Sequence, residues 1–292
     1  MIDWIVNLQG KYPKNVYVYS AGRSYEGRDI PVVVLSNGDG NRNKNTIVVD
    51  AGVHAREWIS HAEALFIISQ LAENSTNHQD LLQTLNWIII PIANPDGYVY
   101  TQTDDRLWRK NRRPSKNSSC IGTDLNRNFG YNWGELGASD HPCHLLYRGE
   151  SAFSEKETKI IKKVLNIYRK RTKFYLSLHA YGNILLYPLN VGSSEKLEFL
   201  AKIGADAILK ATRTKYRVGT PESVIGYAAS GASIDYALGV LQIPFALGME
   251  LPGGGITGFD PPTSFIEPIL RETWIGIRAM AKYVAEKYSE KK

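Results

Sequence analysis

The sequence lacks most of the features that mark fibrous, membrane or disulfide-rich proteins. Only two of its 292 residues are cysteines, which excludes a small scaffold held together by many disulfides. No apolar run approaches the ~20 residues that cross a bilayer, and the run from Trp87 to Pro91 is far too short. No Pro/Gly/Ser linker, low-complexity tract or internal repeat divides the chain. We therefore expect one compact globular domain.

The charge is positive but not concentrated. The net charge is +6, yet Lys and Arg are scattered apart from the stretch 109–113 and the tail Lys291-Lys292. No basic motif interleaved with aromatic residues is present, so we expect no nucleic-acid partner. The start, Met1 to Trp4, lacks the basic-then-apolar pattern of a signal peptide. If the protein is secreted, we expect this chain to be a processed form.

The two cysteines, Cys120 and Cys143, allow two interpretations. The first is a disulfide that closes the loop between them. The second is a metal site in which Cys143 joins His141 and His144, but the paired Cys-x-x-Cys spacing of structural zinc sites is missing. We expect the disulfide, and therefore a secreted, extracellular protein. Two glycosylation sequons agree with secretion, and they begin at Asn74 and Asn117.

Apolar runs of strand length alternate with helical patterns, which indicates an α/β fold. Several strand candidates are continuously apolar, as expected of strands covered on both faces. The candidate strands are 16–19, 30–35, 46–51, 87–91, 174–178, 185–187 and 245–251, and the candidate helices are 59–72, 154–168, 195–211, 233–238 and 267–286. Ser154 and Glu157 fit a capping box. The stretch 104–149 shows little periodicity, and a loop of that length is usually functional.

The strongest chemical signal follows the strand that ends at Ala51. His54 and Glu57 lie between this strand and a helix, at the strand's carboxyl end, where α/β sheets place their ligands. A His-x-x-Glu pair alone also fits a solvated surface turn. His179 ends another strand, and two histidines with one glutamate would leave a fourth zinc position open for water, as catalytic sites require. By contrast, His61 lies within a helical pattern and fits a helix-face or core role.

A catalytic zinc site also needs a general base for the attacking water. Glu250 ends the apolar strand 245–251, where packing explains a carboxylate poorly because unpaired acids are rarely buried. It could accept a proton from the attacking water. The alternative is that Glu250 pairs with an arginine.

These residues resemble the zinc carboxypeptidases of the pancreatic carboxypeptidase A/B type. The matching motifs span nearly the whole chain in the family's order, and they are His54-Ala55-Arg56-Glu57-Trp58, Asn94-Pro95-Asp96-Gly97-Tyr98, Trp108-Arg109-Lys110-Asn111-Arg112, Asp124-Leu125-Asn126-Arg127-Asn128, Leu178-His179-Ala180-Tyr181, Tyr227-Ala228-Ala229-Ser230-Gly231 and Glu250-Leu251. The resemblance implies a zinc-dependent exopeptidase that releases one C-terminal residue. It also implies one catalytic domain over residues 1–292, without signal peptide or propeptide. The implied sheet is mixed, mostly parallel and twisted, with about eight strands and helices on both faces.

The resemblance assigns each site residue a role. One Zn²⁺ per chain would be bound by His54, Glu57 and His179, with Asp124 hydrogen-bonded to His54. Glu250 would be the general base and Arg112 would stabilise the oxyanion. Asn126 and Arg127 would bind the terminal carboxylate of the substrate. Tyr227 would be a mobile tyrosine that covers the bound residue. The outer subsites would be lined by Arg56, Arg109 and Tyr181. Cys120 and Cys143 occupy the positions of the family's recurrent disulfide.

The specificity pocket gives two signals. By the resemblance it is lined by Leu186, Asn190, Glu222, Ala232, Ile234 and Gly248. Family members that remove basic residues usually have Asp where Ile234 stands, which favours an aliphatic or aromatic terminal residue. Glu222, however, would face the pocket in an ungapped alignment, where a substrate lysine could pair with it. We predict a preference for C-terminal Lys, with Arg second, and keep the apolar pocket as the alternative.

The resemblance also names partners. We expect the substrates to be peptide or protein C-termini, and an inhibitory propeptide to bind before activation. Tail-inserting protein inhibitors are a further candidate by analogy. We expect a monomer with no membrane partner.

Overall fold

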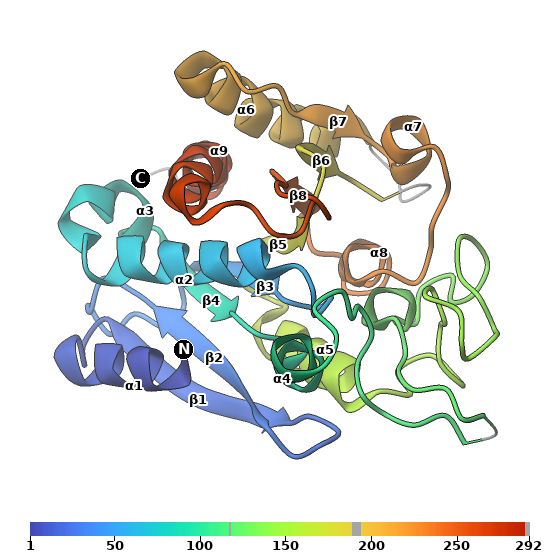
Figure 1. Cartoon of the computed structure of the whole chain (residues 1–292). Coiled ribbons are helices and arrows are strands. Elements are labelled where there is room, and N and C mark those ends of the chain that lie inside the picture. Colours follow the sequence, from blue (N-terminus) through green and yellow to red (C-terminus); the bar gives the residue numbers. More distant parts are fainter. Residues whose placement is uncertain (117, 189–193, 290–292) are drawn as a thin grey trace.

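The computed structural model describes residues 1–116, 118–188 and 194–289, so two residues singled out above, Asn117 and Asn190, lie outside the described residues. One sheet runs through the molecule in the strand order β1-β2-β4-β3-β5-β8-β6-β7 (Figure 1). The strands are β1 (Val16–Arg23), β2 (Asp29–Leu35), β3 (Asn45–Ala51), β4 (Leu85–Ile90), β5 (Thr172–Ala180), β6 (Ile184–Leu186), β7 (Arg217–Gly219) and β8 (Phe245–Leu251). The expected mixed sheet of about eight strands is confirmed.

Four parallel strands form the centre of the sheet. β4, β3, β5 and β8 pair in parallel in that order, while β1, β2 and β6 join by antiparallel pairing. Every residue of β4 is buried, and so is nearly every residue of β3, β5 and β8. This burial explains the continuous apolar runs of the sequence. The carboxyl ends of the four strands share one edge of the sheet, which is where the chemical residues follow.

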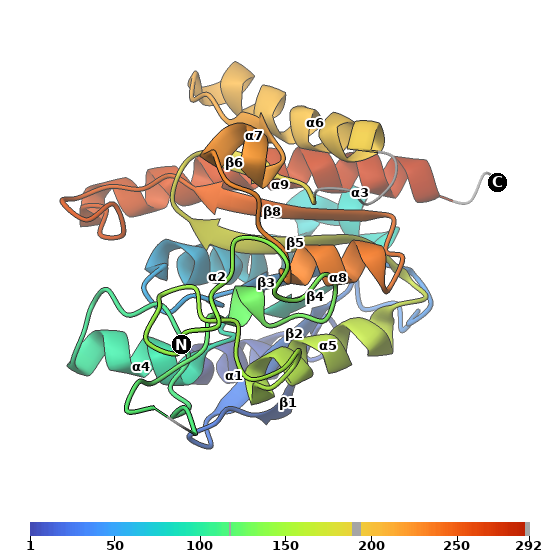
Figure 2. The ribbon, with the colours of Figure 1, turned by 90° about the vertical axis from the view of Figure 1, so that its right-hand side faces the viewer.

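Helices cover both faces of the sheet, as expected (Figure 2). The helices α2 and α9 pack on one face together with α6, and α5 and α8 lie on the other. The helices are α1 (Ile2–Lys11), α2 (Trp58–Ala72), α3 (Gln79–Leu82), α4 (Pro95–Thr103), α5 (Lys156–Tyr168), α6 (Ser194–Thr212), α7 (Pro221–Ile225), α8 (Ser233–Gly239) and α9 (Thr263–Tyr288), with two 3₁₀ turns, η1 (Ser75–His78) and η2 (Leu125–Arg127). No helix of the described residues is long and apolar enough to cross a membrane.

The predicted elements are present, but several short ones had no signal. β7 has three residues, and α3 and α7 have four and five, too few to show periodicity. The capping-box prediction is wrong. Glu155 precedes α5 without a side-chain cap, while the Glu157 carboxylate accepts a hydrogen bond from the backbone of Tyr25. A tertiary contact therefore takes the oxygen that the local motif would have used.

The loop region 104–149 is held by a disulfide and by short β-bridges. Cys120 and Cys143 form the predicted disulfide, with Cα atoms 5.1 Å apart, which excludes the alternative metal site at Cys143. Short bridges pair Pro114 with Ile121 and Ser139 with Tyr147. The loop is thus held in one conformation against the carboxyl edge of the sheet.

One buried acid, Glu63, lies away from the carboxyl edge of the sheet. Glu63 lies in α2 with no exposed surface, and neither carboxylate oxygen has a hydrogen-bond partner among the described residues. Burial raises the pKa of Glu63 well above its usual value, because desolvation disfavours the charged form. The folded protein therefore holds the Glu63 proton to higher pH than the unfolded chain does.

This acid predicts a pH-dependent stability. The unfolded chain loses the Glu63 proton above its ordinary pKa of 4.5, whereas the folded chain keeps it to higher pH. The contribution is complete below pH 4.5 and is lost as the pH rises toward the folded pKa, at about 1.4 kcal/mol per pH unit. We expect Glu63→Gln to be more stable than the parent at pH 8 in urea denaturation, and little different at pH 4. Glu195→Gln, an exposed acid of α6, is the control, and equal pH slopes for Glu63→Gln and the parent would contradict the prediction.

Candidate metal centre

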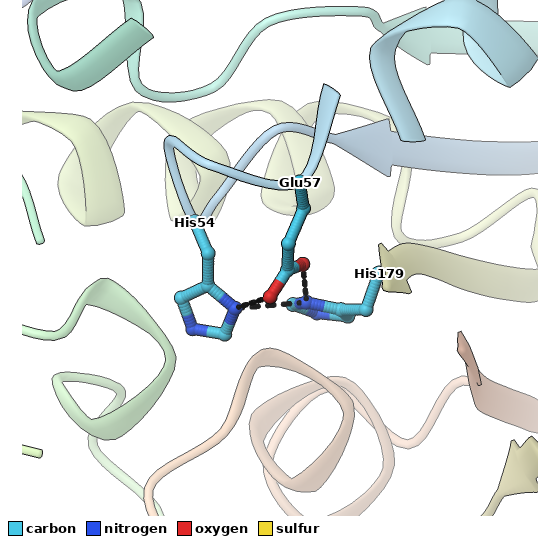
Figure 3. A group of neighbouring side chains, drawn as sticks. All are labelled: His54, Glu57 and His179. Atoms are coloured by element: carbon cyan, nitrogen blue, oxygen red, sulfur yellow. Dashed lines mark hydrogen bonds and ion pairs between the residues drawn. The ribbon is translucent and has the colours of Figure 1, made fainter. Parts of the chain in front are cut away.

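Two histidines and a glutamate from distant stretches converge on one point. His54 and Glu57 lie between β3 and α2, and His179 lies near the end of β5, with the three side chains directed toward one another (Figure 3). The Nδ1 atom of His54 is 2.8 Å from Glu57 Oε1, and the Nδ1 atom of His179 is 3.0 Å from Glu57 Oε2. One ligand atom from each residue lies within 4.8 Å of the others, and all three side chains are buried. The predicted convergence is confirmed.

The donor set fits a zinc ion. Two imidazole nitrogens and one carboxylate are the ligands of many catalytic zinc sites, and they leave coordination positions for water and substrate. Burial raises the pKa of Glu57, but the two histidines outweigh burial and hold the pKa of that carboxyl below its usual range. Burial lowers the pKa of His179, and Glu57 outweighs it, raising the pKa to about 9. The cluster thus holds an ionised carboxylate between two imidazoles, and either a proton on His179 or a metal ion would compensate its charge.

The local backbone explains how a turn holds two ligands. Gly52 follows β3 with a φ of +66°, and a Cβ atom there would lie 1.8 Å from the His61 ring. The Ser60 hydroxyl donates to the Glu57 carbonyl and accepts from the Gly52 amide. His61 Nδ1 lies 3.1 Å from the Pro91 carbonyl, and burial lowers the pKa of His61 to about 4. His61 is a neutral core histidine, in line with its helical pattern.

His54 is oriented by an acid, and the acid by an arginine. Asp124 Oδ1 lies 3.1 Å from His54 Nε2, the nitrogen that faces away from the cluster. Arg109 donates to Asp124 Oδ2 from Nε at 3.0 Å and from Nη2 at 2.9 Å. Burial raises the pKa of Asp124, but Arg109 and His54 outweigh it and keep that pKa well below its usual value. An ionised Asp124 therefore fixes the His54 tautomer with Nδ1 free for a metal.

His179 is oriented by a second chain of contacts, which the sequence analysis missed. Ser177 Oγ lies 3.0 Å from His179 Nε2 and donates to Asp50 Oδ1 at 2.6 Å. The Tyr175 hydroxyl donates to the other Asp50 oxygen, and Asp50 is fully buried. Tyr175, Ser177 and His179 alternate along β5, so all three face the same side of the sheet. This alternation of polar residues along β5 was the sequence signal that could have identified the contacts of His179.

Glu250 lies beside the cluster. It pairs in register with His179 across the parallel strands β5 and β8, and its side chain remains partly accessible. Burial and the negative charge of Glu57 raise the pKa of Glu250 to about 7, against the opposing effects of His179, Arg109 and Arg127. A divalent cation between these acids would lower that pKa, because it adds positive charge nearby.

Of the two arginines given roles above, Arg109 and not Arg112 lies beside the cluster. Arg109 lies beside the cluster, with Nη1 3.7 Å from Glu57 Oε1. The guanidinium of Arg112 instead stacks on two aromatic rings, 3.5 Å from the Tyr100 centroid and 4.5 Å from the Trp108 centroid. The role predicted for Arg112 has no support in these contacts. Three arginines lie within five residues here, and no periodicity in the sequence distinguishes them.

The residues expected at the substrate carboxylate occupy one region. The Asn126 amide nitrogen lies 3.4 Å from His179 Nε2, and its carbonyl oxygen accepts from the Ser233 amide. Arg127 is buried and donates to the carbonyls of Gly137 and Asn126. Tyr227 is 46% exposed on the loop between α7 and α8, so its ring is not packed into the core.

Three predicted pocket residues meet, whereas Glu222 lies at the surface. A Cβ atom at Gly248 would be 3.6 Å from Leu186 Cβ and 3.8 Å from Ile234 Cδ1. Ile234 is buried, Ala232 is half-buried, and Glu222 is exposed in the first turn of α7. These contacts form an apolar wall.

Arg56 and Tyr181 form a separate group with Phe259, which the sequence analysis did not select. The Arg56 guanidinium lies 4.4 Å from the Phe259 ring, and the Tyr181 ring lies 4.9 Å from it. Phe259 lies in a loop without periodicity, so no sequence pattern marked it.

Comparison with known proteins agrees with this geometry. The sequence profile of the zinc carboxypeptidase family matches residues 1–276. Carboxypeptidase B of Astacus astacus is 37% identical over 98% of this chain and 95% of that protein. Mast cell carboxypeptidase A of Homo sapiens is 37% identical over 97% of this chain and 69% of that protein.

Solved structures show the same similarity. Bovine thrombin-activatable fibrinolysis inhibitor, in complex with tick carboxypeptidase inhibitor, superposes with a TM-score of 0.91 at 32% identity, covering 98% of this chain and 96% of that one. Carboxypeptidase A of Helicoverpa armigera gives a TM-score of 0.89 at 35% identity, covering 98% of this chain and 73% of that one. With its buried His₂Glu cluster, the chain belongs to the zinc carboxypeptidase family and is a metallocarboxypeptidase of the A/B type.

Proposed function

We propose that this zinc carboxypeptidase releases single aliphatic or aromatic residues from the C-termini of peptides. The observation that carries the proposal is the apolar contact between Leu186, Ile234 and Gly248, close to the carboxyl edge of the sheet. Side chains of this type bury an apolar terminal residue and offer no partner to a charged one.

Each site residue then has a defined task. His54, Glu57 and His179 would hold the zinc ion, which when bound polarises the scissile carbonyl and lowers the pKa of water. Glu250, one strand away from His179, accepts the proton of the attacking water and delivers it to the leaving amine.

Arg109 is the arginine placed to stabilise the oxyanion. It is largely buried beside Glu57, and a fixed cation is most effective where charge develops in a dry site. Its hydrogen bonds to Asp124 hold the guanidinium in place before substrate arrives. Arg112, stacked on Tyr100 and Trp108, would instead stabilise the packing of the loop that carries it.

The terminal carboxylate of the substrate would bind to Asn126 and Arg127. Both emerge from η2, directly after Asp124, and Arg127 is buried with its guanidinium directed by two backbone carbonyls. Tyr227, about half exposed on a loop between two glycines of positive φ, would close over the bound residue. Arg56 and Tyr181, with Phe259, would contact residues further from the terminus.

The preference for Lys predicted from Glu222 stays open to experiment, but we favour the apolar alternative. Glu222 is exposed, so water already solvates its carboxylate, and a screened pair with lysine would contribute little. A terminal lysine would have to place its ammonium beyond Ile234 to reach water.

The remaining expectations are also proposals. We propose an extracellular location on the strength of the Cys120–Cys143 disulfide. Tail-inserting protein inhibitors are proposed because a similar structure holds a tick carboxypeptidase inhibitor. Inhibition by a propeptide and a monomeric state remain predictions from the family resemblance.

A hydrolysis panel tests the preference. Blocked dipeptides ending in Phe, Leu, Lys, Arg or Glu should give kcat/KM values about 10- to 100-fold higher for Phe and Leu than for Lys, because an ammonium in an apolar pocket lacks a partner. Glu222→Gln is the control and should leave every ratio unchanged. Faster cleavage of Lys than Phe, lost in Glu222→Gln, would establish the basic-pocket alternative instead.

The two arginines are separated by substitution. Arg109→Gln should lower kcat by about 10²- to 10³-fold through loss of oxyanion stabilisation, while Arg112→Gln should change it by only a few fold. Because Arg109 also contacts Asp124, zinc content must be measured in both variants by atomic absorption. A large loss of kcat in zinc-replete Arg112→Gln, with Arg109→Gln active, would restore the original assignment.

Ser177 predicts a change in metal affinity without a change in ligands. In Ser177→Ala, His179 Nε2 loses the Ser177 hydroxyl that lies 3.0 Å from it, and zinc should bind about 10- to 100-fold more weakly in competition with a chromogenic chelator. Ser20→Ala, an exposed serine of β1, is the matched control. Unchanged zinc affinity in Ser177→Ala would show that the Asp50 chain does not orient the ligand.

A further inference from the structure

A cleft of about 520 Å³ lies at the opposite edge of the sheet from the metal cluster. Thr46 at the start of β3 and Asn86 at the start of β4 line it, whereas His54 follows the other end of β3. β3 has seven residues, so the two regions are separated by roughly 20 Å. The cleft is therefore independent of the peptidase site.

The floor of the cleft is formed by part of the sheet. Tyr17 of β1, Val34 of β2 and Ile88 of β4 are neighbours in register across three strands, and all three line the cleft. The helix α5, which packs against β1 on this face, ends at Tyr168, and its last residues, Ile167 and Tyr168, line the cleft beside them. Tyr17 is 60% exposed, and Ile167 at the mouth is 54% exposed. Tyr17 and Ile167 thus leave apolar surface open to solvent in the cleft and Val34 is partly accessible, whereas Ile88 is only 1% exposed.

Among the residues that the structure describes, the charged side chains that line the cleft are all cations, Lys14, Arg42 and Arg171. None of the three cations forms an ion pair within residues 1–116, 118–188 and 194–289. The rim therefore attracts anions, because no acid of the described residues pairs with its three cations.

Hydrogen bonds join the segments that carry the rim. A guanidinium nitrogen of Arg171 donates to the Arg42 carbonyl, which joins the segment before β5 to the loop after β2. The Asn86 amide donates to the Asn41 carbonyl at 3.1 Å, and Asn15 donates to Ser36 at the other side of the same loop. The cleft is built by contacts between separate elements, as preformed ligand sites are.

We propose that this cleft binds a small amphipathic carboxylate, with its apolar tail on Tyr17, Val34 and Ile167 and its carboxylate between Lys14 and Arg171. The volume lies within the range of small-molecule sites, and the combination of an apolar floor with a cationic rim selects this class. A neutral lipid would leave the cations without a partner, and a polyanion would leave the apolar floor uncovered.

Decanoate, below its micelle concentration, is the probe for the zinc-loaded full chain. Isothermal titration should show saturable binding, about fourfold tighter for each methylene added between octanoate and decanoate. Decanol and decyltrimethylammonium should bind at least tenfold more weakly. Arg171→Gln should weaken decanoate binding about three- to tenfold, whereas Arg213→Gln, an exposed arginine at the end of α6, should not change it.

Two further variants decide whether the cleft is the site. Val34→Trp fills the floor and should abolish binding, with circular dichroism and peptidase activity confirming that it folds. Arg127→Gln tests the peptidase site, because Arg127 would also bind carboxylates there. Loss of decanoate binding in Arg127→Gln, with Arg171→Gln unaffected, would overturn the proposal. Binding to phosphatidylserine vesicles without binding to monomeric decanoate would overturn it as well.

Discussion

The carboxylate of Glu57, buried between His54 and His179, is the interaction on which the rest of the site depends. A buried carboxylate is unfavourable unless other charges and donors compensate it. Here two imidazoles, the Ala180 amide and the Arg109 guanidinium all approach Glu57. A zinc ion would add the strongest compensation of all. The surrounding residues can be understood as the means by which this charge is kept in place.

The sheet makes this arrangement possible. His179 and Glu250 are register neighbours on parallel strands, and β3, the strand before His54, pairs with β5 on its other side. Parallel pairing brings the carboxyl ends of strands distant in sequence to one edge. The fastened loop 104–149 then adds Arg109, Asp124, Asn126 and Arg127 to that edge. Strands supply the ligands and the base, and the loop supplies the residues for charge and substrate.

The sequence predicted those parts that depend on strand ends, and missed those that depend on tertiary contacts. His54, Glu57 and His179 each follow or end an apolar run, so topology alone places them together. Arg109 and Arg112 could not be distinguished, because three residues of irregular backbone decide which guanidinium points inward. The capping box at Ser154 failed for a similar reason, since Glu157 is used by Tyr25 from a remote strand–turn. Short elements such as β7 and α7 carry too few residues for any period to appear.

The net positive charge of the chain lies away from the metal cluster. At the metal cluster the three acids Glu57, Asp124 and Glu250 outnumber the two arginines Arg109 and Arg127, so the net charge of +6 arises elsewhere. The segment from Lys156 to Lys173 contains eight Lys or Arg residues and one acid, Glu157, whose carboxylate is buried against Tyr25 and Asn111. This segment forms α5 and leads into Arg171 at the cationic cleft. Charge is therefore arranged differently at the two edges of the sheet. At the carboxyl edge, Asp124 and Glu57 lie against Arg109. At the amino edge, Lys14, Arg42 and Arg171 form no ion pair with another described residue, which is the charge pattern that an anionic ligand would complement.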